Sequence, residues 1–281
     1  MQMNSDGYQV LLQSAAVAGL DYDQLLYRWV HLIAGVTWLS MLFSFTLIHA
    51  NAVAALEADV RRKVVPEYVP RTMFWFAWGS LLTWLTGIAL LMKLYYSSKS
   101  SPIMYAATSE HAGEHMPWSL IGQAFGGMFL LFVVYDAIAR ATAKFAEVGY
   151  LLWAAVAVGY GCYLDSYLHM SHRAIFIHIG GLLGTAMVAN AWMTIVPCFR
   201  RIVAATREGK PADPKDLDRA GVRSRHNLFM STPLLFLMVA VHQEKLLGFE
   251  RWQLPIAGVL ILGLVIGWSL RKAAPSVGRA S

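Results

Sequence analysis

The chain has 281 residues, of which 57% are hydrophobic and only 14% are charged, and its mean hydropathy is +0.48. Soluble domains carry nearer a quarter charged residues, so this composition excludes an ordinary soluble domain and predicts a membrane protein with modest loops. The formal net charge of +6 does not indicate nucleic-acid binding, because the basic residues cluster beside the apolar segments, as membrane topology requires.

Seven apolar segments follow one another, each long enough to cross a hydrocarbon core of roughly 30 Å at about 1.5 Å per residue. They cover residues 25–49, 72–95, 119–142, 149–168, 172–197, 229–247 and 252–270. We therefore expect an all-α, polytopic membrane helical bundle over residues 25–271. A polar-to-amphipathic lead-in over 1–24 precedes it, and a basic tail over 272–281 follows it.

Two polar segments interrupt the apolar pattern most clearly. Residues 50–71 carry basic residues together with Pro66 and Pro70, which act as breakers, so we expect a loop there. Residues 198–228 are dense in Arg and Lys and read as the longest polar loop.

The basic residues alternate between the two sides of the expected bundle. The segments after spans 1, 3, 5 and 7 hold about 4, 2, 8 and 3 Lys and Arg, whereas those before span 1 and after spans 2, 4 and 6 hold about 0, 1, 1 and 2. By the positive-inside rule, the N-terminus lies outside and the C-terminus lies in the cytoplasm. The expected location is a bacterial cytoplasmic (inner) membrane.

Three histidines fall at similar depths in this topology. His31 and His178 each lie about six residues from the outer ends of spans 1 and 5, and His242 lies about five residues from the outer end of span 6, so all three sit roughly 7–9 Å below the outer boundary. Ionisable residues at membrane depth are costly and mark candidate sites. Imidazole is a common axial ligand of heme iron, so we expect two of the three to hold a b-type heme. The alternative is that each histidine only bonds a neighbouring helix.

Glycines accompany these histidines. Gly35 follows His31 by one turn, and Gly180, Gly181 and Gly184 follow His178, which would leave a flat, side-chain-free wall for a macrocycle. The spacings Gly122/Gly126 and Gly180/Gly184 also permit close approach of two helix backbones. Lys93, near the outer end of span 2, is a candidate partner for a heme propionate.

A second layer of polar residues falls near the cytoplasmic boundary. It contains His49 and His226, which would suit a second heme, although His226 reads more simply as part of a helix start. Asp136 and Arg140 have the i,i+4 spacing of an ion pair on one helix. Outside the spans, His111 and His115 are four residues apart and would suit a metal only if that segment were helical.

The sequence resembles the membrane domain of bacterial membrane-bound urate oxidases (urate hydroxylases). The resemblance rests on the blocks RWVHLIAGVTWLSMLFSFTLIHANAVAAL, RTMFWFAWGSLLTWLTGIALL, HIGGLLGTAMVANAWMTIVPCFRRIVAA and RSRHNLFMSTPLLFLMVAVH, in this order. It implies a membrane oxidoreductase in which water supplies the hydroxyl oxygen and heme or quinone takes the electrons. Members of that family often carry a C-terminal cytochrome c domain, which is not found in this chain, so the acceptor would be a separate cytochrome c or a quinone. The first block is also similar to heme-binding membrane protoporphyrinogen oxidases and copper-resistance membrane proteins.

Three functions therefore stay open. The first is a urate oxidase-like membrane oxidoreductase. The second is a membrane anchor and electron-transfer subunit for a soluble dehydrogenase, for example of the molybdenum type, docked on the basic segment 198–228. The third is a metal-handling or transport protein. No C-x-x-C-H motif occurs, so covalent c-type heme is excluded. No phosphate loop or nucleotide fingerprint occurs either, so the sequence gives poor support to an ATPase.

Overall fold

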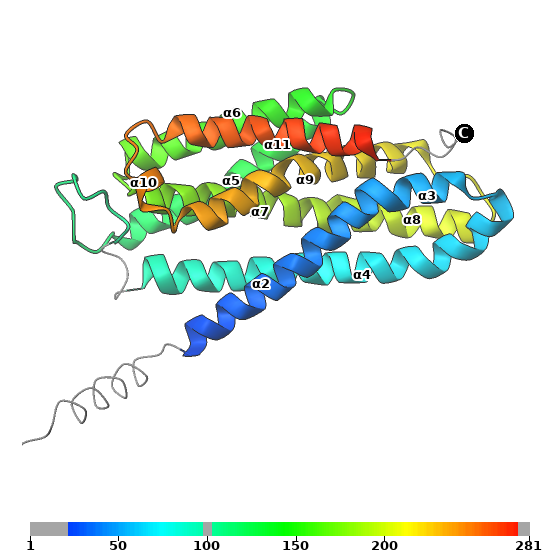
Figure 1. Cartoon of the computed structure of the whole chain (residues 1–281), viewed down its shortest axis with the longest axis horizontal. Coiled ribbons are helices and arrows are strands. Elements are labelled where there is room, and N and C mark those ends of the chain that lie inside the picture. Colours follow the sequence, from blue (N-terminus) through cyan, green and yellow to red (C-terminus); the bar gives the residue numbers. More distant parts are fainter. Residues whose placement is uncertain (1–21, 98–102, 275–281) are drawn as a thin grey trace, which may run out of the picture.

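The protein consists of helices that run back and forth along one direction (Figure 1). The computed structural model describes residues 22–97 and 103–274. The helices are α2 (Tyr22–Phe43), η1 (Ser44–His49), α3 (Ala50–Ala55), α4 (Ala58–Leu91), η2 (Met92–Tyr96), α5 (Trp118–Ala141), α6 (Ala146–Ser166), α7 (His172–Asn190), η4 (Ala191–Ile195), α8 (Val196–Arg207), α9 (Pro214–Ala240), α10 (Glu244–Leu247) and α11 (Gln253–Ala273). No strand forms in these residues, which confirms the all-α prediction. Most of the lead-in and most of the tail lie outside the described residues.

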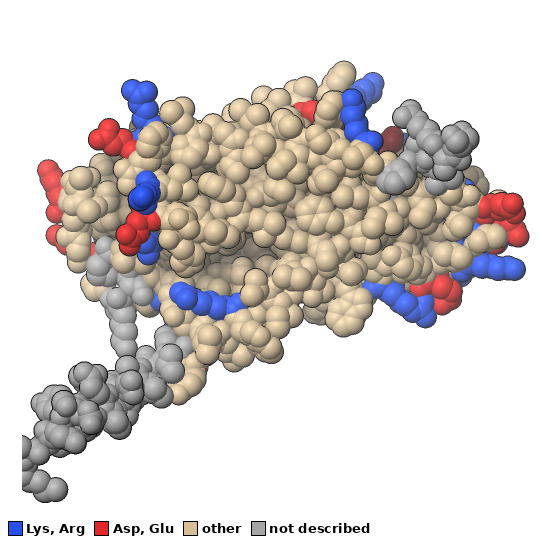
Figure 2. Space-filling view, in the orientation of Figure 1, with Lys and Arg blue, Asp and Glu red and all other residues tan. Residues whose placement is uncertain are grey.

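Six helical stretches in the described part of the chain are long and apolar enough to cross a membrane. They are Tyr22–Ala55, Ala58–Tyr96, Trp118–Ala141, Ala146–Ser166, His172–Arg207 and Gln253–Ala273. On the face shown in Figure 2, charged side chains gather at the two ends of the molecule and leave a nearly uncharged band between them. This distribution is that of a multi-pass membrane protein lying in a lipid bilayer.

The sixth expected span, residues 229–247, corresponds to the second half of α9, and α9 as a whole is too polar to be among these six stretches. It runs along the bundle in contact with α7 and α11 (Figure 1). Arg223, His226 and Asn227 of this helix are all buried, so these three polar side chains face other helices instead of lipid. With α9 included, α2 begins and α11 ends at opposite ends of the bundle, as an odd number of passes requires.

The centre of the bundle is α7. In the stretch His172–Arg207, 78% of the most apolar window is buried, whereas the corresponding values for the other five stretches lie between 22% and 39%. Those five stretches expose much of their apolar surface, as lipid-facing helices do. On α2, for example, Trp29, Leu32 and Val36 are about 60% exposed or more, and the helix slants away from the bundle toward its start (Figure 1).

Both segments that we expected to be loops are largely helical. Within 50–71, α4 starts at Ala58 and continues through Pro66 and Pro70. Pro66 is buried beside Val65 and Val69, so tertiary packing offsets the cost of proline inside a helix. Within 198–228, α8 and α9 leave only a short connection. Arg, Lys and Glu are good helix formers, so these residues end the apolar pattern without ending the helix.

Close backbone approach occurs at glycines other than the expected pairs. A Cβ added to Gly79 of α4 would lie 3.1 Å from the backbone nitrogen of Trp38 on α2. A Cβ on Gly263 of α11 would lie 2.5 Å from the backbone oxygen of Phe229 on α9, with Pro233 equally close by. In contrast, Gly122 and Gly126 of α5 face open space. Glycine therefore joins α2 to α4 and α11 to α9.

We expect Gly263→Ala to destabilise the protein, because the new methyl group would overlap the backbone of α9. Overpacking of this kind costs about 1–3 kcal/mol. The matched control is Gly258→Ala on the same helix, where no atom lies within 4 Å of the added Cβ. Thermal unfolding in detergent would show a lower Tm for the first variant only, and equal Tm values would contradict the close contact between α9 and α11.

Candidate functional site

His178 is fully buried near the start of α7, and protein groups bond both nitrogens of its ring. Its Nδ1 lies 2.6 Å from the backbone oxygen of Ala174, one turn earlier in the same helix. A carbonyl oxygen only accepts hydrogen bonds, so Nδ1 carries the proton and donates it. The other nitrogen, Nε2, therefore holds the lone pair and accepts the O–H of Tyr96, whose oxygen lies 2.6 Å away.

His31 on α2 has the same protonation, which a side chain of α4 determines. Its Nδ1 lies 3.2 Å from the hydroxyl oxygen of Thr86. That hydroxyl lies 2.6 Å from the backbone oxygen of Leu82 and 3.0 Å from that of Thr83, so its own hydrogen points to the backbone. Nδ1 of His31 is therefore the donor in its bond to Thr86, and Nε2 carries the lone pair.

The two histidines meet the same helical stretch at different heights. The ring of His31 lies against Gly87, where an added Cβ would be only 3.0 Å from its Cε1. Tyr96, which bonds His178, lies nine residues further along, or roughly 14 Å at 1.5 Å per residue. The structure thus brings both imidazoles to the outer end of α4 and η2 without placing them in contact.

His242, the third histidine of the expected set, lies apart from this pair. It is exposed and sits in a turn that follows Ala240, the last residue of α9. The predicted span continued to residue 247 because leucines follow, but the intervening polar residues 243–245 end the helix, and α10 forms separately. The expected group of three is therefore reduced to two histidines inside the bundle.

Methionine side chains cover the glycine surface that we expected beside His178. A Cβ on Gly180 would lie 2.5 Å from Cε of Met238, and one on Gly181 would lie 2.8 Å from Sδ of Met128. Methionine side chains are flexible and adapt to irregular space. The surface is therefore closed here by groups that can shift, not by backbone.

Lys93 has a carboxylate partner in the structure. Its Nζ lies 3.4 Å from Oδ2 of Asp23, which is largely exposed. An exposed ion pair of this kind contributes roughly 0–1 kcal/mol. A role for Lys93 beside a propionate stays a prediction.

His49, in the expected second layer, is held by stacking. Its ring lies 4.4 Å from the ring of Phe45 and 4.9 Å from the ring of Tyr68, measured between centroids, and both pairs are nearly parallel. The side chain is 8% exposed. His49 thus contacts Phe45 and Tyr68, whereas His226 bonds Tyr135 and Ala146, and a second heme between these two histidines stays a prediction.

His226 lies in a buried hydrogen-bonded network that the sequence did not reveal. Its Nε2 lies 2.8 Å from the backbone oxygen of Ala146, so Nε2 is the donor. Its Nδ1 accepts from the hydroxyl of Tyr135 at 3.0 Å. Asn190 of α7 donates to the same Tyr135 oxygen at 2.6 Å and to Oδ1 of Asn227 at 2.8 Å. These bonds join α5, α6, α7 and α9.

A buried charge completes this network. The Arg223 guanidinium bonds Asp136 of α5, Nη1 lies 3.3 Å from Oδ1 of Asn190, and the cation lies 5.1 Å from the ring centroid of Tyr135. Arg140 also contacts Asp136, at 2.7 Å, which confirms the expected i,i+4 pair. Asp136 therefore forms ion pairs with one exposed arginine, Arg140, and one buried arginine, Arg223.

Each π-helical turn in the described residues lies at one of these histidine sites. His49 ends η1, Tyr96 ends η2, and Asn190 directly precedes η4. Such turns add a residue to a helix and change the direction of its side chains, and they occur frequently at functional sites. They mark three places where an ordinary α-helix would point these side chains elsewhere.

Among the described residues, no group of three His, Cys, Asp or Glu side chains is arranged to hold a metal ion. In the outer segment, His111 bonds the Glu114 carboxylate at 3.0 Å. His31 and His178 therefore give a better candidate site than the histidines of the outer segment.

We expect Arg223→Met to destabilise the protein much more than Arg140→Met, although both variants lose the same partner. Breaking a buried ion pair costs about 3–5 kcal/mol because the remaining charge stays buried, whereas an exposed pair contributes roughly 0–1 kcal/mol. The Arg223 side chain is 6% exposed and that of Arg140 is 77% exposed. Denaturation in mixed micelles measures both, and similar losses of stability would contradict a structural role for the network.

Comparison of this chain with curated proteins and with solved structures gives no match. A comparison with family models does give one, to the family described as "Urate oxidase N-terminal", over residues 56–273. The matched range covers more than three quarters of the chain and includes His178, His226 and the whole of α4 to α11. The chain belongs to the urate oxidase N-terminal family.

Proposed function

We propose that this protein is a urate oxidase-like membrane oxidoreductase that holds one b-type heme through His178 and His31 and passes electrons to the respiratory chain. The observation that supports it best is the protonation of the two imidazoles. Each donates Nδ1–H to a protein oxygen and presents the lone pair of Nε2. Histidines that bind metals are oriented in this way, with the second nitrogen held by a protein acceptor.

His178 is prepared for a ligand by two of its neighbours. The bond to Ala174 fixes the ring in the helix groove and determines which nitrogen is basic. Tyr96 satisfies Nε2 with a hydroxyl, which is a group on a rotatable side chain. Binding of an iron at Nε2 would replace one hydrogen bond, and it would require Tyr96 to turn away.

The surroundings of His31 differ from those of His178. Thr86 orients the ring, and Gly87 leaves the space that it occupies. Because α2 slants away from the bundle at this end, the protein is open beside it, and a hollow is visible above α2 in Figure 2. His31 would reach a group held at His178 only by a movement of α2, because Gly87 and Tyr96, which the two imidazoles contact, lie nine residues apart on one helical stretch.

The chemistry of the proposed reaction follows from the family. Urate would lose two electrons and two protons while water supplies the hydroxyl oxygen. A bound heme supplies one-electron transfer, and a quinone or a separate cytochrome c would be the final acceptor. The protein's own part is to hold two neutral imidazoles, of which that of His178 is fully buried and that of His31 is partly buried.

The alternative is a membrane anchor for a soluble dehydrogenase that docks on residues 198–228. In the structure, part of this basic segment is neutralised within the chain. Arg201 pairs with Asp216 at 2.6 Å, and Lys210 pairs with Glu208 at 2.8 Å. These pairs reduce the positive charge available to an acidic partner, which favours the first function over the second.

We expect the purified protein to show a b-type absorption band that depends on His178 and His31. His178→Ala and His31→Ala should each remove the band or reduce the heme content, because each removes one nitrogen ligand. His242→Ala is the matched control, since this histidine is exposed and lies outside the bundle. A pyridine hemochrome assay measures the heme content. Folded wild-type protein without heme, or equal loss in the His242 variant, would contradict the assignment.

A second measurement separates the enzyme from the anchor. Under the first function, urate alone should reduce the heme of the purified protein, as seen in the difference spectrum. Under the second, reduction should appear only after a soluble dehydrogenase fraction and its substrate are added. Reduction by neither donor would contradict both electron-transfer proposals.

A further inference from the structure

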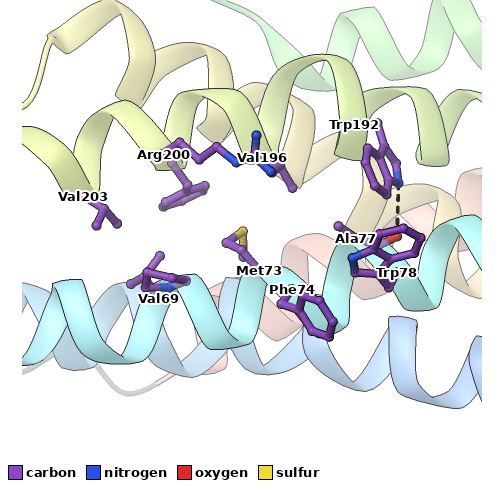
Figure 3. A pocket seen from close by; sticks show the side chains of 11 residues that line it. Val69, Met73, Phe74, Ala77, Trp78, Trp192, Val196, Arg200 and Val203 are labelled. Atoms are coloured by element: carbon purple, nitrogen blue, oxygen red, sulfur yellow. Dashed lines mark hydrogen bonds between the residues drawn. The ribbon is translucent and has the colours of Figure 1, made fainter.

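A groove on the outside of the bundle, between α4 and α8, is not used by the proposed reaction (Figure 3). Its volume is about 300 Å³, at the lower end of the range for small-molecule sites. It is lined by Val69, Pro70, Met73, Phe74, Ala77, Trp78, Trp192, Val196, Phe199, Arg200 and Val203. Phe74 and Trp78 are both more than half exposed, so the groove opens toward the lipid.

The lining excludes a polar ligand such as a purine. Arg200 is its only charged side chain, and the indole nitrogen of Trp192 already donates to the backbone oxygen of Ala77 at 3.0 Å. A purine would leave most of its polar edges without partners, and each such group costs about 1–3 kcal/mol. The groove therefore suits a ligand with one polar end and a long apolar body.

The charge at the groove selects the polar end of that ligand. Arg200 is exposed, and it has no acidic partner among the described residues. Its neighbour Arg201 is held by Asp216, and Glu67, close to the groove on α4, is held by Arg71 at 2.9 Å. Within the described part of the chain, Arg200 is thus a cation without a compensating carboxylate.

By the predicted topology, Arg200 lies in the cytoplasmic half of the bundle. It lies seven residues before Arg207, the last residue of α8, or roughly 10 Å from the cytoplasmic end of that helix. Figure 3 shows its side chain running along α8 toward Val196, at the edge of the groove. The apolar side chains of Met73 and Phe74 continue the groove toward Trp78, deeper in the membrane.

We infer that this groove binds an anionic phospholipid of the cytoplasmic leaflet, with its phosphate at Arg200 and one acyl chain against Met73, Phe74 and Trp78. A headgroup with a net negative charge is attracted to Arg200. A zwitterionic headgroup is attracted less, because its own cation is repelled by the arginine. A basic residue near an anionic membrane surface contributes about 1 kcal/mol, which corresponds to about fivefold in affinity.

Native mass spectrometry of the full chain in detergent tests this site with phosphatidylglycerol and phosphatidylcholine of identical acyl chains. We expect phosphatidylglycerol to bind about fivefold more tightly, and Arg200→Gln to remove that preference. Arg207→Gln is the matched control, because it removes the same charge from the same helix outside the groove. Ala77→Leu, which fills the groove, should weaken both lipids. Tm values in the same detergent establish that each variant is folded.

Several results would overturn the inference. Equal affinity of the wild-type protein for the two lipids would remove the charge argument. Equal effects of Arg200→Gln and Arg207→Gln would mean that the basic surface attracts lipid without a site. Displacement of phosphatidylglycerol by a stoichiometric amount of a benzoquinone with an alkyl tail would assign the groove to a neutral ligand.

Discussion

Hydrocarbon offers no partner for a hydrogen bond, and this constraint determines where the polar side chains of the bundle lie. His178, His226 and Asn227 all sit on the two central helices, α7 and α9, and each bonds groups of neighbouring segments. The indole N–H groups of Trp38 and Trp153 are buried without a partner among the described residues, so the constraint is satisfied more strictly for the histidines and amides than for the tryptophans.

The same constraint explains which parts of the fold could be predicted from the sequence. Apolar length alone identifies helices such as α5 and α11, because their lipid-facing surfaces must be apolar. It fails for α9, whose polar first half is partly exposed and partly buried, as at Arg223 and His226, and which therefore reads as a loop until residue 229. It also fails at His242, since leucines after the end of α9 extend the apolar pattern beyond the helix. Polarity along the chain reports contact with lipid, not the limits of a helix.

The residues that contact the candidate site were even harder to predict from the sequence than the helices. That His178 lies at membrane depth follows from counting residues, but its bond to Tyr96 joins positions 82 residues apart. Tyr96 ends a π-helical turn, and no local sequence pattern predicts such a turn. Similarly, Gly263 meets α9 because of how two helices cross, whereas Gly122 and Gly126 have the favoured spacing and meet nothing.

The two fully buried histidines differ in a way that separates structure from function. His226 donates from Nε2 and accepts at Nδ1, and its partners Tyr135 and Asn190 are bonded in turn to further buried groups. Any new ligand there would break several bonds at once, so His226 is a structural residue. His178 has the opposite protonation, and only the hydroxyl of Tyr96 covers its basic nitrogen. A ligand there exchanges one bond for another, which is why the outer histidine, and not the inner one, is the better candidate for chemistry.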